Sequence, residues 1–331
     1  MILNVFFVCV PHHSALNTRF VACKGLRDPF NVAAPKAVDD VNILVLGATG
    51  LLGNAVFRSL SRMRGAQVTG TIRQDSARRL FDGALAAHLT VAGNIEDPGL
   101  LTELFDAVRP DVVVNCVAVG RPAPADPMRS IAVYAVLPHR LSHLCKLAGA
   151  RLIQVSSDGV FSGHRGTYTE ADVPDADDVY GTSKFLGEVD APHAVTLRTS
   201  IIGHELQGGS GLLEWFLSQQ GECRCFTRAI FSGFPTIVLA DMIRDIVLPR
   251  PDLSGIYHVA TRPISKFDLL LLVAERYGKR IKLLADDRPA PDRSLVADRF
   301  ERFTGYKPPE WPALVDEMYR DKFSSVGHDE G

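Results

Sequence analysis

The sequence predicts an α/β fold, in which a doubly wound parallel sheet is covered by helices on both faces. From residue 42 onward, short apolar runs typical of strands alternate with segments that have the period of a helix. One of these runs, Asp111–Val119, is nearly unbroken in its apolar character, which is typical of a parallel strand buried on both faces. The first run leads directly into a glycine-rich turn and then into a helix. Strands that alternate with helices imply right-handed crossovers within one parallel sheet.

The elements of this sheet are expected between residues 41 and 200. In the second segment Val56, Leu60 and Met63 share one helical face, and the later helices show the same core spacing. The predicted strands are Asn42–Gly47, Gln67–Ile72, Asp111–Val119, Arg151–Ser156 and Ala194–Thr199, and the predicted helices are Asn54–Arg64, Leu100–Val108, Ile131–Ala148 and Tyr180–Val189. We therefore expect residues 41–200 to form a dinucleotide-binding domain.

The alternation becomes irregular after Thr199, which predicts a smaller C-terminal lobe over the open end of the sheet. Residues 201–331 are expected to be mainly this substrate-binding lobe, with some segments returning to the sheet. Ser265 is a predicted N-cap, and Gly278 is the predicted end of the same helix. The expected elements are helices Leu212–Gln219, Leu239–Val247 and Ser265–Tyr277, a strand Gly255–Val259, and a loop-rich tail marked by Pro289, Pro291, Pro308, Pro309 and Pro312.

Composition excludes several classes of protein. The chain has 331 residues and a formal net charge of −2, which gives no reason to expect a nucleic acid as a partner. No apolar run reaches the roughly 20 residues of a membrane helix. Six scattered cysteines predict a reduced, cytoplasmic protein without a disulfide framework, and Cys223-Arg224-Cys225 lacks the second ligand pair of a zinc site.

The first 40 residues differ from the rest of the chain. The segment Met1–Val10 is apolar, but no Lys or Arg precedes it and no clean cleavage site follows, so a secretory signal is not expected. The remainder of the segment has no clear period. Residues 1–40 are therefore predicted to be a loosely ordered N-terminal extension.

The glycine-rich turn, Gly47-Ala48-Thr49-Gly50-Leu51-Leu52-Gly53, has the properties of a dinucleotide site. Gly47 permits a tight turn, Gly50 lets the backbone approach a pyrophosphate, and Gly53 lets the helix pack on the strand. The helix N-terminus would then face the phosphates with its free N–H groups. The spacing departs from G-x-G-x-x-G, and a tight loop without a ligand is the alternative interpretation.

The end of the second predicted strand bears on the choice of cofactor. An acidic side chain there would bind the ribose 2′-hydroxyl of NAD, but no acid occurs before Asp75. Arg73 can instead pair with a 2′-phosphate, which favours NADPH and leaves NADH open; a solvated surface arginine is the alternative. Expected cofactor contacts are Gly47, Thr49, Gly50, Leu51, Leu52, Gly53, Arg73, Asn94, Ile95, Cys116, Val117, Ala118, Tyr180 and Lys184.

A second group of residues points to proton transfer. The strand Arg151–Ser156 runs into Ser157, at the sheet edge where ligands collect in doubly wound folds. Tyr180 and Lys184 are four residues apart and therefore share one face of a helix. A nearby ammonium lowers the pKa of a phenol, which suits a general acid. An isolated pair of this kind is usually surface decoration, but the serine edge and the glycine turn favour catalysis.

Together these motifs resemble those of the extended short-chain dehydrogenase/reductases, over about residues 42–320. The motifs are the glycine turn, Asn115-Cys116-Val117-Ala118, the serine edge, and Tyr180 with Lys184. Three further segments resemble the dTDP-4-dehydrorhamnose reductase branch of this family. They are Val155-Ser156-Ser157-Asp158-Gly159-Val160-Phe161-Ser162-Gly163, Leu197-Arg198-Thr199-Ser200 and Gly233-Phe234-Pro235-Thr236.

The resemblance implies a Rossmann-type fold and the reduction of a 4-keto-6-deoxy sugar nucleotide. The hydride would come from NADPH and the proton from Tyr180. Lys184 would hold the nicotinamide ribose and tune Tyr180, while Ser157 would polarise the ketone. Substrate contacts are expected at Ser157, Asp158, Arg198 and Ile201, no metal is expected, and the assembly is left open, with a homodimer as one expectation.

Four positions depart from the branch that the chain resembles. Ser157 stands where that branch usually has Thr, Gly159 replaces a usual Tyr, and Ile201 replaces a usual Trp. Tyr134 stands where the family often has Asn in a proton relay. These departures leave N-acetylated UDP-sugars open as substrates. A non-catalytic subunit similar to the β subunit of methionine adenosyltransferase is a second alternative, and a sugar-nucleotide epimerase or dehydratase is a third.

Overall fold

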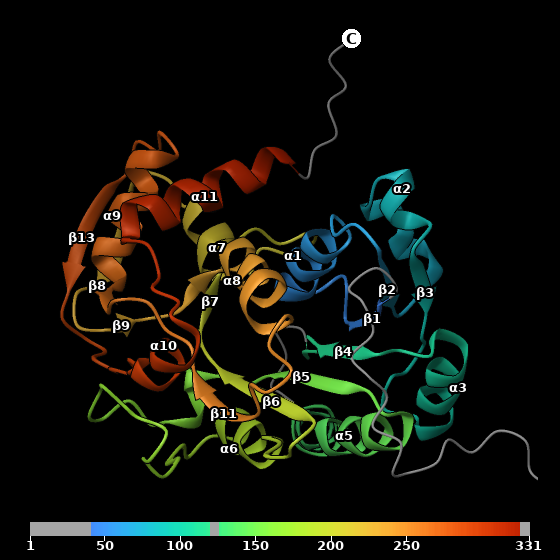
Figure 1. Ribbon diagram of the computed structural model, residues 1–331. Helices are drawn as coiled ribbons and strands as arrows, with labels where there is room; N and C mark the ends of the chain where they lie inside the picture. Colours follow the sequence, from blue (N-terminus) through green and yellow to red (C-terminus); the bar gives the residue numbers. More distant parts are fainter. Residues whose placement is uncertain (1–40, 120–125, 325–331) are drawn as a thin grey trace, which may run out of the picture. The chain divides into compact units, whose positions relative to one another are not determined.

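The computed structural model describes residues 41–119 and 126–324, and its centre is a seven-stranded sheet with helices on both faces (Figure 1). Every neighbouring pair of strands in this sheet is parallel. The predicted doubly wound α/β fold is therefore confirmed, while the expectations for residues 1–40 lie outside the described residues. The strand order is β11-β6-β5-β4-β1-β2-β3, with β1 at Val41–Leu46, β2 at Ala66–Ile72, β3 at Leu89–Val91, β4 at Val112–Asn115, β5 at Arg151–Val155, β6 at Ala194–Arg198 and β11 at Gly255–His258.

Alternate side chains of β1 point into two different cores. Ile43 and Val45 belong to the core on one face of the sheet, whereas Leu44 and Leu46 belong to the core on the other. The first face is covered by α1 (Leu51–Leu60) and α8 (Thr236–Met242), and the second by α3 (Pro98–Val108) and α5 (Leu137–Ala148) (Figure 1). Burial on both faces explains why these strands are apolar throughout.

The helix predicted over 131–148 is longer and less regular than expected. It begins with α4 (Pro127–Ser130), widens into a π-helical turn over Ile131–Val136, and continues as α5. Pro138 explains the widening, because proline has no N–H for the carbonyl of Tyr134 and its ring collides with a carbonyl four residues earlier. The irregular turn therefore fixes where Tyr134 lies.

Shorter elements connect the strands. The predicted helix 180–189 is α6 (Val179–Leu186), which ends earlier, with Gly187 as its C-cap. Gly187 packs tightly on the π-helical turn, since a Cβ there would lie only 1.8 Å from the carbonyl oxygen of Tyr134. The predicted strand 111–119 ends at Asn115, whose side chain accepts a hydrogen bond from Val117 N–H as the chain turns away. The remaining short helices are 3₁₀ turns at Asp75–Leu80 and Asp158–Val160 and α2 at Gly83–Ala86.

The C-terminal part has a second apolar core of its own. It contains Cys223 and Cys225 from one strand, with Trp311 and Leu314 from the last described helix. The elements after β6 are β7 (Ile201–Ile202), α7 (Leu212–Ser218), β8 (Glu222–Phe226), β9 (Ile230–Phe231), β10 (Phe234–Pro235), a π turn at Ile243–Val247, β12 (Ile264–Ser265), α9 (Lys266–Arg276), β13 (Lys282–Asp286), α10 (Asp298–Thr304) and α11 (Trp311–Ser324). The strands pair as β7–β10, β8–β13 and β9–β12.

Two predictions for the C-terminal part concern the start of α9 and the proline-rich tail. Ser265 is the N-cap of α9, because its hydroxyl accepts a hydrogen bond from Asp268 N–H, so that prediction is confirmed. The predicted loop-rich tail is only partly right: Pro289, Pro291, Pro308 and Pro309 lie in loops, but α10 and α11 form in the same part of the chain. Pro312 stands in the first turn of α11, where a helix needs no N–H donor and tolerates proline.

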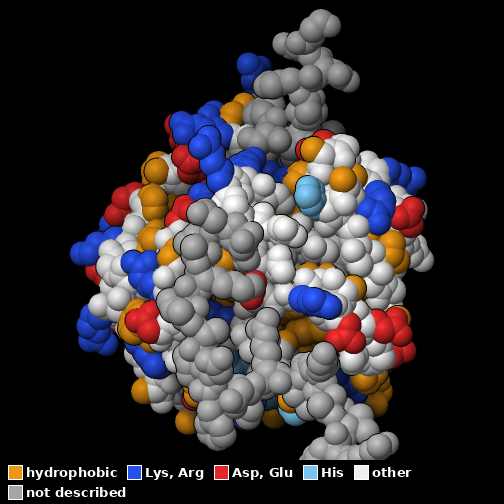
Figure 2. Space-filling view, turned by 45° about the vertical axis from the view of Figure 1, so that its right-hand side comes forward, with side chains coloured by type: hydrophobic (Ala, Val, Ile, Leu, Met, Phe, Trp, Pro, Cys, Tyr) orange, Lys and Arg blue, Asp and Glu red, His pale blue; other side chains and the backbone are white. Residues whose placement is uncertain are grey.

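The surface of the described part carries both charge signs. In the view of Figure 2, basic and acidic side chains are interspersed over the described residues, with no broad patch of one sign. None of the helices in the described part of the chain has the length and apolar character needed to cross a bilayer.

A buried ion pair joins α1 to α11, the first and last helices of the described residues. The two terminal guanidinium nitrogens of Arg58 on α1 donate to the carboxylate of Asp321 on α11, each at 2.8 Å. The third nitrogen, Nε, donates to Asn54 Oδ1 at 3.3 Å. The two charged side chains are only 8% and 7% exposed. Removing one partner therefore leaves the other charge in the interior.

We expect Asp321→Ala to lower the free energy of unfolding by about 3–5 kcal/mol, because it strands the Arg58 charge. The matched control is Glu310→Ala beside the start of α11, whose pair with Arg262 is exposed and should contribute at most about 1 kcal/mol. Urea unfolding of both variants measures the difference. Equal losses would contradict the assignment of this pair as the clamp between α1 and α11.

Candidate active site

The glycine turn brings the backbones of β1, α1 and the residue after β4 into close contact. Gly47 has a φ of +81°, which only glycine adopts easily, and a Cβ at Gly53 would lie 2.0 Å from its carbonyl oxygen. Gly47 also approaches the next strand, since its own Cβ would lie 3.1 Å from the carbonyl oxygen of Cys116. The space beside Gly50 is more open, because the nearest atom to a Cβ there would be the carbonyl oxygen of Gly47, at 3.3 Å.

Helix α1 begins at Leu51, three residues earlier than predicted, with Gly50 as its N-cap. No side chain caps this end, so backbone N–H groups in the first turn remain available for a phosphate. The turn lies between β1 and β4, where the strand order reverses and doubly wound folds bind dinucleotides. These observations fit a dinucleotide at the predicted turn residues.

The other predicted cofactor residues follow neighbouring strands at the same edge. Arg73 comes directly after β2 and is exposed, while Asn94 and Ile95 follow β3. Cys116 is buried at the end of β4, whereas Val117 and Ala118 are more exposed. Arg73 thus lies on the same sheet edge as the glycine turn.

Gly159 brings Ser157 and Tyr180 together. The point where a Cβ of Gly159 would stand is 2.9 Å from ring atom Cε1 of Tyr180 and 3.1 Å from Ser157 Oγ. The serine hydroxyl and the edge of the phenol ring are therefore close neighbours. A residue larger than glycine at position 159 would displace one of them.

Lys184 completes the group from the next turn of α6. Its ammonium donates a hydrogen bond to the carbonyl of Val155, at the end of β5, and lies 4.8 Å from the ring centre of Tyr134. Burial lowers the pKa of Lys184 from 10.5 to about 8, an effect that Cys116 and Glu188 partly oppose. The structure thus brings Ser157, Tyr180 and Lys184 to the edge that carries the glycine turn.

Asp158 is a site residue with an unusual proton affinity. Burial raises its pKa from 3.8 to about 6, while the charge of Arg293 and hydrogen bonds from Ser157 and Ser200 lower it. The hydroxyl of Ser157 lies 3.2 Å from Asp158 Oδ1 and accepts a bond from Gly159 N–H at 3.0 Å. A carboxyl that titrates near neutrality can serve as a donor or an acceptor beside a substrate.

Arg198 lies in the interior beneath this group. Its guanidinium donates two 2.7 Å hydrogen bonds to the carboxylate of Glu188, and both side chains are less than 5% exposed. Ser156 Oγ donates to the same carboxylate at 2.8 Å. This arrangement favours a supporting role for Arg198, although substrate contact was expected from the sequence. Ile201, also predicted to contact substrate, is partly buried in β7.

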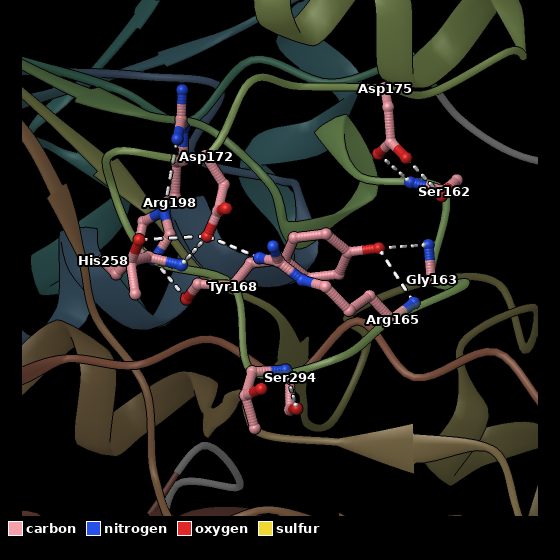
Figure 3. A network of polar contacts seen from close by, with 11 residues as sticks. Ser162, Gly163, Arg165, Tyr168, Asp172, Asp175, Arg198, His258 and Ser294 are labelled. Atoms are coloured by element: carbon pink, nitrogen blue, oxygen red, sulfur yellow. Dashed lines mark hydrogen bonds and ion pairs between the residues drawn. The ribbon is translucent and has the colours of Figure 1, made fainter.

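A histidine links this ion pair to the loop before α6 (Figure 3). Burial and the charge of Arg198 lower the pKa of His258 to about 4, so the ring is neutral. Its Nδ1 lies 3.1 Å from the carbonyl of Tyr168 and its Nε2 lies 3.2 Å from Arg198. Because a carbonyl and a guanidinium need opposite partners, Nδ1 carries the proton and Nε2 accepts.

The loop itself is held by Tyr168. Its ring stacks on the ring of Phe161, with centroids 4.1 Å apart. Its hydroxyl accepts hydrogen bonds from the backbone N–H groups of Gly163 and Arg165, at 3.2 and 3.3 Å (Figure 3). Sequence reasoning missed Glu188, Tyr168 and His258. The spacing of four residues between Lys184 and Glu188 was the available signal, whereas His258 is identified only by the pairing of β11 with β6.

Cys223 and Cys225 lie away from this edge, in the second core. Their sulfur atoms are 3.8 Å apart and both residues are buried. Within the described ranges, no group of three or more His, Cys, Asp or Glu side chains could hold a metal ion.

Comparison with known proteins places these features in a family context. The family model described as RmlD substrate binding domain matches residues 41–322. A methionine adenosyltransferase 2 subunit beta from Xenopus tropicalis is 26% identical over 85% of this chain and 92% of its own. The spore coat polysaccharide biosynthesis protein SpsK from Bacillus subtilis is also 26% identical, over 86% of this chain and 98% of its own.

Solved structures share the fold over most of the chain. A dTDP-4-dehydrorhamnose reductase from Bacillus anthracis in complex with NADP has a TM-score of 0.69 at 18% identity, covering 85% of this chain and 99% of its own. The enzyme WbmG from Bordetella bronchiseptica, in complex with NAD and UDP, has a TM-score of 0.68 at 20% identity, covering 86% and 96%. At such low identities, the likeness concerns the fold alone.

The buried ammonium of Lys184 predicts a pH-dependent penalty on stability. Its pKa in the folded chain is lower than in the unfolded chain, so the unfolded state binds more protons between pH 8 and 10.5 and stability rises with pH there. We expect Lys184→Met to be more stable than the unaltered protein at pH 7. The gain should shrink as the pH rises through about 8.

Thermal unfolding between pH 6 and 10.5 tests this expectation. Lys146→Met, at the exposed C-terminal end of α5, is the matched control and should give no comparable gain. A Lys184→Met variant that is less stable at every pH would show that the lysine's contacts outweigh its desolvation.

Proposed function

We propose, from the premise that this chain belongs to the family of the RmlD substrate binding domain, that it is an NADPH-dependent reductase of a 4-keto-6-deoxy sugar nucleotide. The family match confirms the resemblance expected from the sequence. The observation that carries the proposal is the meeting of Ser157, Tyr180 and Lys184 beside the glycine turn. Such an arrangement suits hydride and proton addition to a ketone in deoxysugar or polysaccharide precursor synthesis.

Each residue has a distinct role in the proposed reduction. NADPH, when bound, supplies the hydride to the carbonyl carbon. Ser157 Oγ–H donates a hydrogen bond to the ketone oxygen, and Tyr180 Oη–H gives that oxygen its proton, so that the ketone becomes an alcohol. Lys184 stabilises the tyrosinate that remains, because a nearby ammonium favours the ionised phenol.

The cofactor would be held by the glycine turn and the ends of the neighbouring strands. Gly47 and Gly53 allow α1 to approach the turn closely, and the uncapped N-terminus of α1 offers N–H groups to the pyrophosphate. Arg73 would bind the 2′-phosphate. Lys184 would contact the nicotinamide ribose, and Asp158 would contact the sugar.

A second candidate function rests on the curated relatives. A protein named methionine adenosyltransferase 2 subunit beta is 26% identical to this chain, the same identity as SpsK. The alternative is therefore a regulatory subunit that binds NADP and catalyses no reduction. A sugar-nucleotide epimerase is a third possibility within the same fold, and it would consume no net NADPH.

Turnover distinguishes these candidates. The purified protein is mixed with NADPH and with a 4-keto-6-deoxy sugar nucleotide carrying dTDP or UDP, and absorbance at the nicotinamide band is followed. Stoichiometric NADPH oxidation with formation of the alcohol supports the reductase. Tight NADPH binding without oxidation supports the subunit, and isomerised sugar without oxidation supports the epimerase.

Tyr180→Phe removes only the proposed proton donor. Since general acid catalysis contributes about 10²–10⁴-fold, we expect kcat to fall in this range while NADPH affinity is retained. Tyr306→Phe, which deletes a hydroxyl beside α10, is the control and should keep its kcat. A Tyr180→Phe variant with wild-type turnover would place the acid elsewhere.

Arg73→Ala tests the choice of cofactor. The unaltered protein should bind NADPH more tightly than NADH, and loss of one guanidinium–phosphate pair should weaken NADPH by about 10–100-fold, because charge-assisted bonds contribute about 1.5–3 kcal/mol. NADH affinity should change little. Fluorescence titrations of both cofactors measure the ratio, with exposed Arg62→Ala as the charge control; equal affinities in the unaltered protein would refute the assignment.

A further inference from the structure

Tyr134 touches three parts of the candidate site at once. Its hydroxyl accepts a 2.8 Å hydrogen bond from the N–H of Val119, just beyond the predicted cofactor residues Cys116–Ala118. Its ring meets the ring of Tyr180 edge to face, with centroids 5.3 Å apart. The ammonium of Lys184 lies over the same ring, 4.8 Å from its centre.

The position of this side chain is determined by its surroundings. Tyr134 is only 6% exposed and lies in the π-helical turn that Pro138 imposes. Gly187 packs so closely on its backbone that a Cβ there would stand 1.8 Å from the Tyr134 carbonyl oxygen. A tyrosine held on both its backbone and its hydroxyl presents a fixed ring to Lys184 and Tyr180.

The ring of Tyr134 offers the Lys184 ammonium an aromatic face, which the other neighbours of this ammonium do not provide. Those neighbours are the carbonyl of Val155, which accepts its hydrogen bond, the buried thiol of Cys116 and the carboxylate of Glu188. Burial raises the pKa of Cys116 to about 12, so it is a neutral thiol, and Glu188 is shared with Arg198 and Ser156. An aromatic face attracts a cation without offering it an ion pair.

We propose that Tyr134 is a positioning residue of the reductase site, whose ring holds the charged ammonium of Lys184 against Tyr180 and whose hydroxyl ties that pair to the strand end that binds the cofactor. The inference rests on the proposed function for its kinetic part only. The ring and the hydroxyl have separate tasks, so separate substitutions resolve them.

The ring is tested by Tyr134→Phe, which retains it, and by Tyr134→Leu and Tyr134→Met, which remove it. The rate at which the Lys184 amine is reductively methylated, followed by peptide mass spectrometry across pH 6–11, gives its pKa without any turnover. Since a desolvated cation–π contact is equivalent to about 0.5–1.5 pKa units, the ring-deleting variants should lower the Lys184 pKa by that amount. Tyr134→Phe should restore it to the unaltered value.

The control for loss of a buried ring is Tyr257→Leu, because Tyr257 also lies beneath a cation, Arg299, but at the edge strand β11. It should lose stability and leave the Lys184 pKa unchanged. If Tyr134→Leu does not fold, Tyr134→Met provides the same comparison. An unchanged Lys184 pKa in the folded ring-deleting variant would overturn the proposal.

The hydroxyl is tested by cofactor titration and kinetics. Tyr134→Phe removes the hydroxyl that accepts from Val119 N–H at 2.8 Å and donates to the Val119 carbonyl at 3.4 Å. It should weaken NADPH binding by about 3–10-fold, as expected for the loss of a neutral hydrogen bond. The ring-deleting variants should in addition lower kcat by about tenfold or more relative to Tyr134→Phe. Equal kcat values in Tyr134→Phe and Tyr134→Met would also contradict the proposal.

The two proposals fail in different ways. If the unaltered protein reduces no sugar nucleotide but Lys184 shows the expected pKa dependence on the ring, the reductase function is wrong and the positioning role stands. If turnover is found and the Lys184 pKa does not respond to loss of the ring, the positioning role is wrong and the reductase stands.

Discussion

The close approach of Gly47, Gly53 and Cys116 is the contact on which the rest of the site depends. At this point the end of β1, the first turn of α1 and the end of β4 are separated by little more than backbone atoms. Any side chain at Gly53 would push the helix from the strand, and the uncapped N–H groups of α1 would no longer face the sheet edge. The same contact sets the position of Cys116, whose thiol neighbours Lys184. The cofactor side and the proton-donating side of the site are thus joined through one crowded turn.

The sequence allowed much of this arrangement to be predicted, because its strongest signals are local. The glycine turn, the apolar strands and the Tyr180–Lys184 spacing each act within a few residues and survive without knowledge of the fold. Helix α11 could not be predicted in the same way, because Pro308, Pro309 and Pro312 around its start suggested a loop, while α11 packs against α9 and α8. The short β8 and β13 strands were also missed, since they pair only with each other across some 60 residues. The partners of Arg198 depend on the pairing of β6 with β11, a long-range choice that no local pattern contains.

Beneath the site, a buried polar network replaces apolar packing. Glu188, Arg198 and His258 are enclosed together, and nearly every donor in this group has an acceptor. Such a network fixes orientation more than it adds stability, because half-satisfied buried charges are strongly unfavourable and alternative packings are excluded. Its members lie under Ser156, at the strand end that precedes Ser157 and Asp158. The network therefore holds Ser156, and the serine edge that follows it, in a fixed position.

The ion pair between Arg58 and Asp321 also has a consequence for how the chain is made. The two residues are 263 positions apart, so the first crossover helix receives its buried partner only after almost the whole described chain has left the ribosome. Until then Arg58 lacks the carboxylate with which it pairs in the folded chain, and the first βαβ unit has an incomplete surface. Contacts of such large sequence separation slow folding and lengthen the exposure of partly folded states. Formation of this pair is therefore a late closure step, in which α11 completes the buried surface of α1.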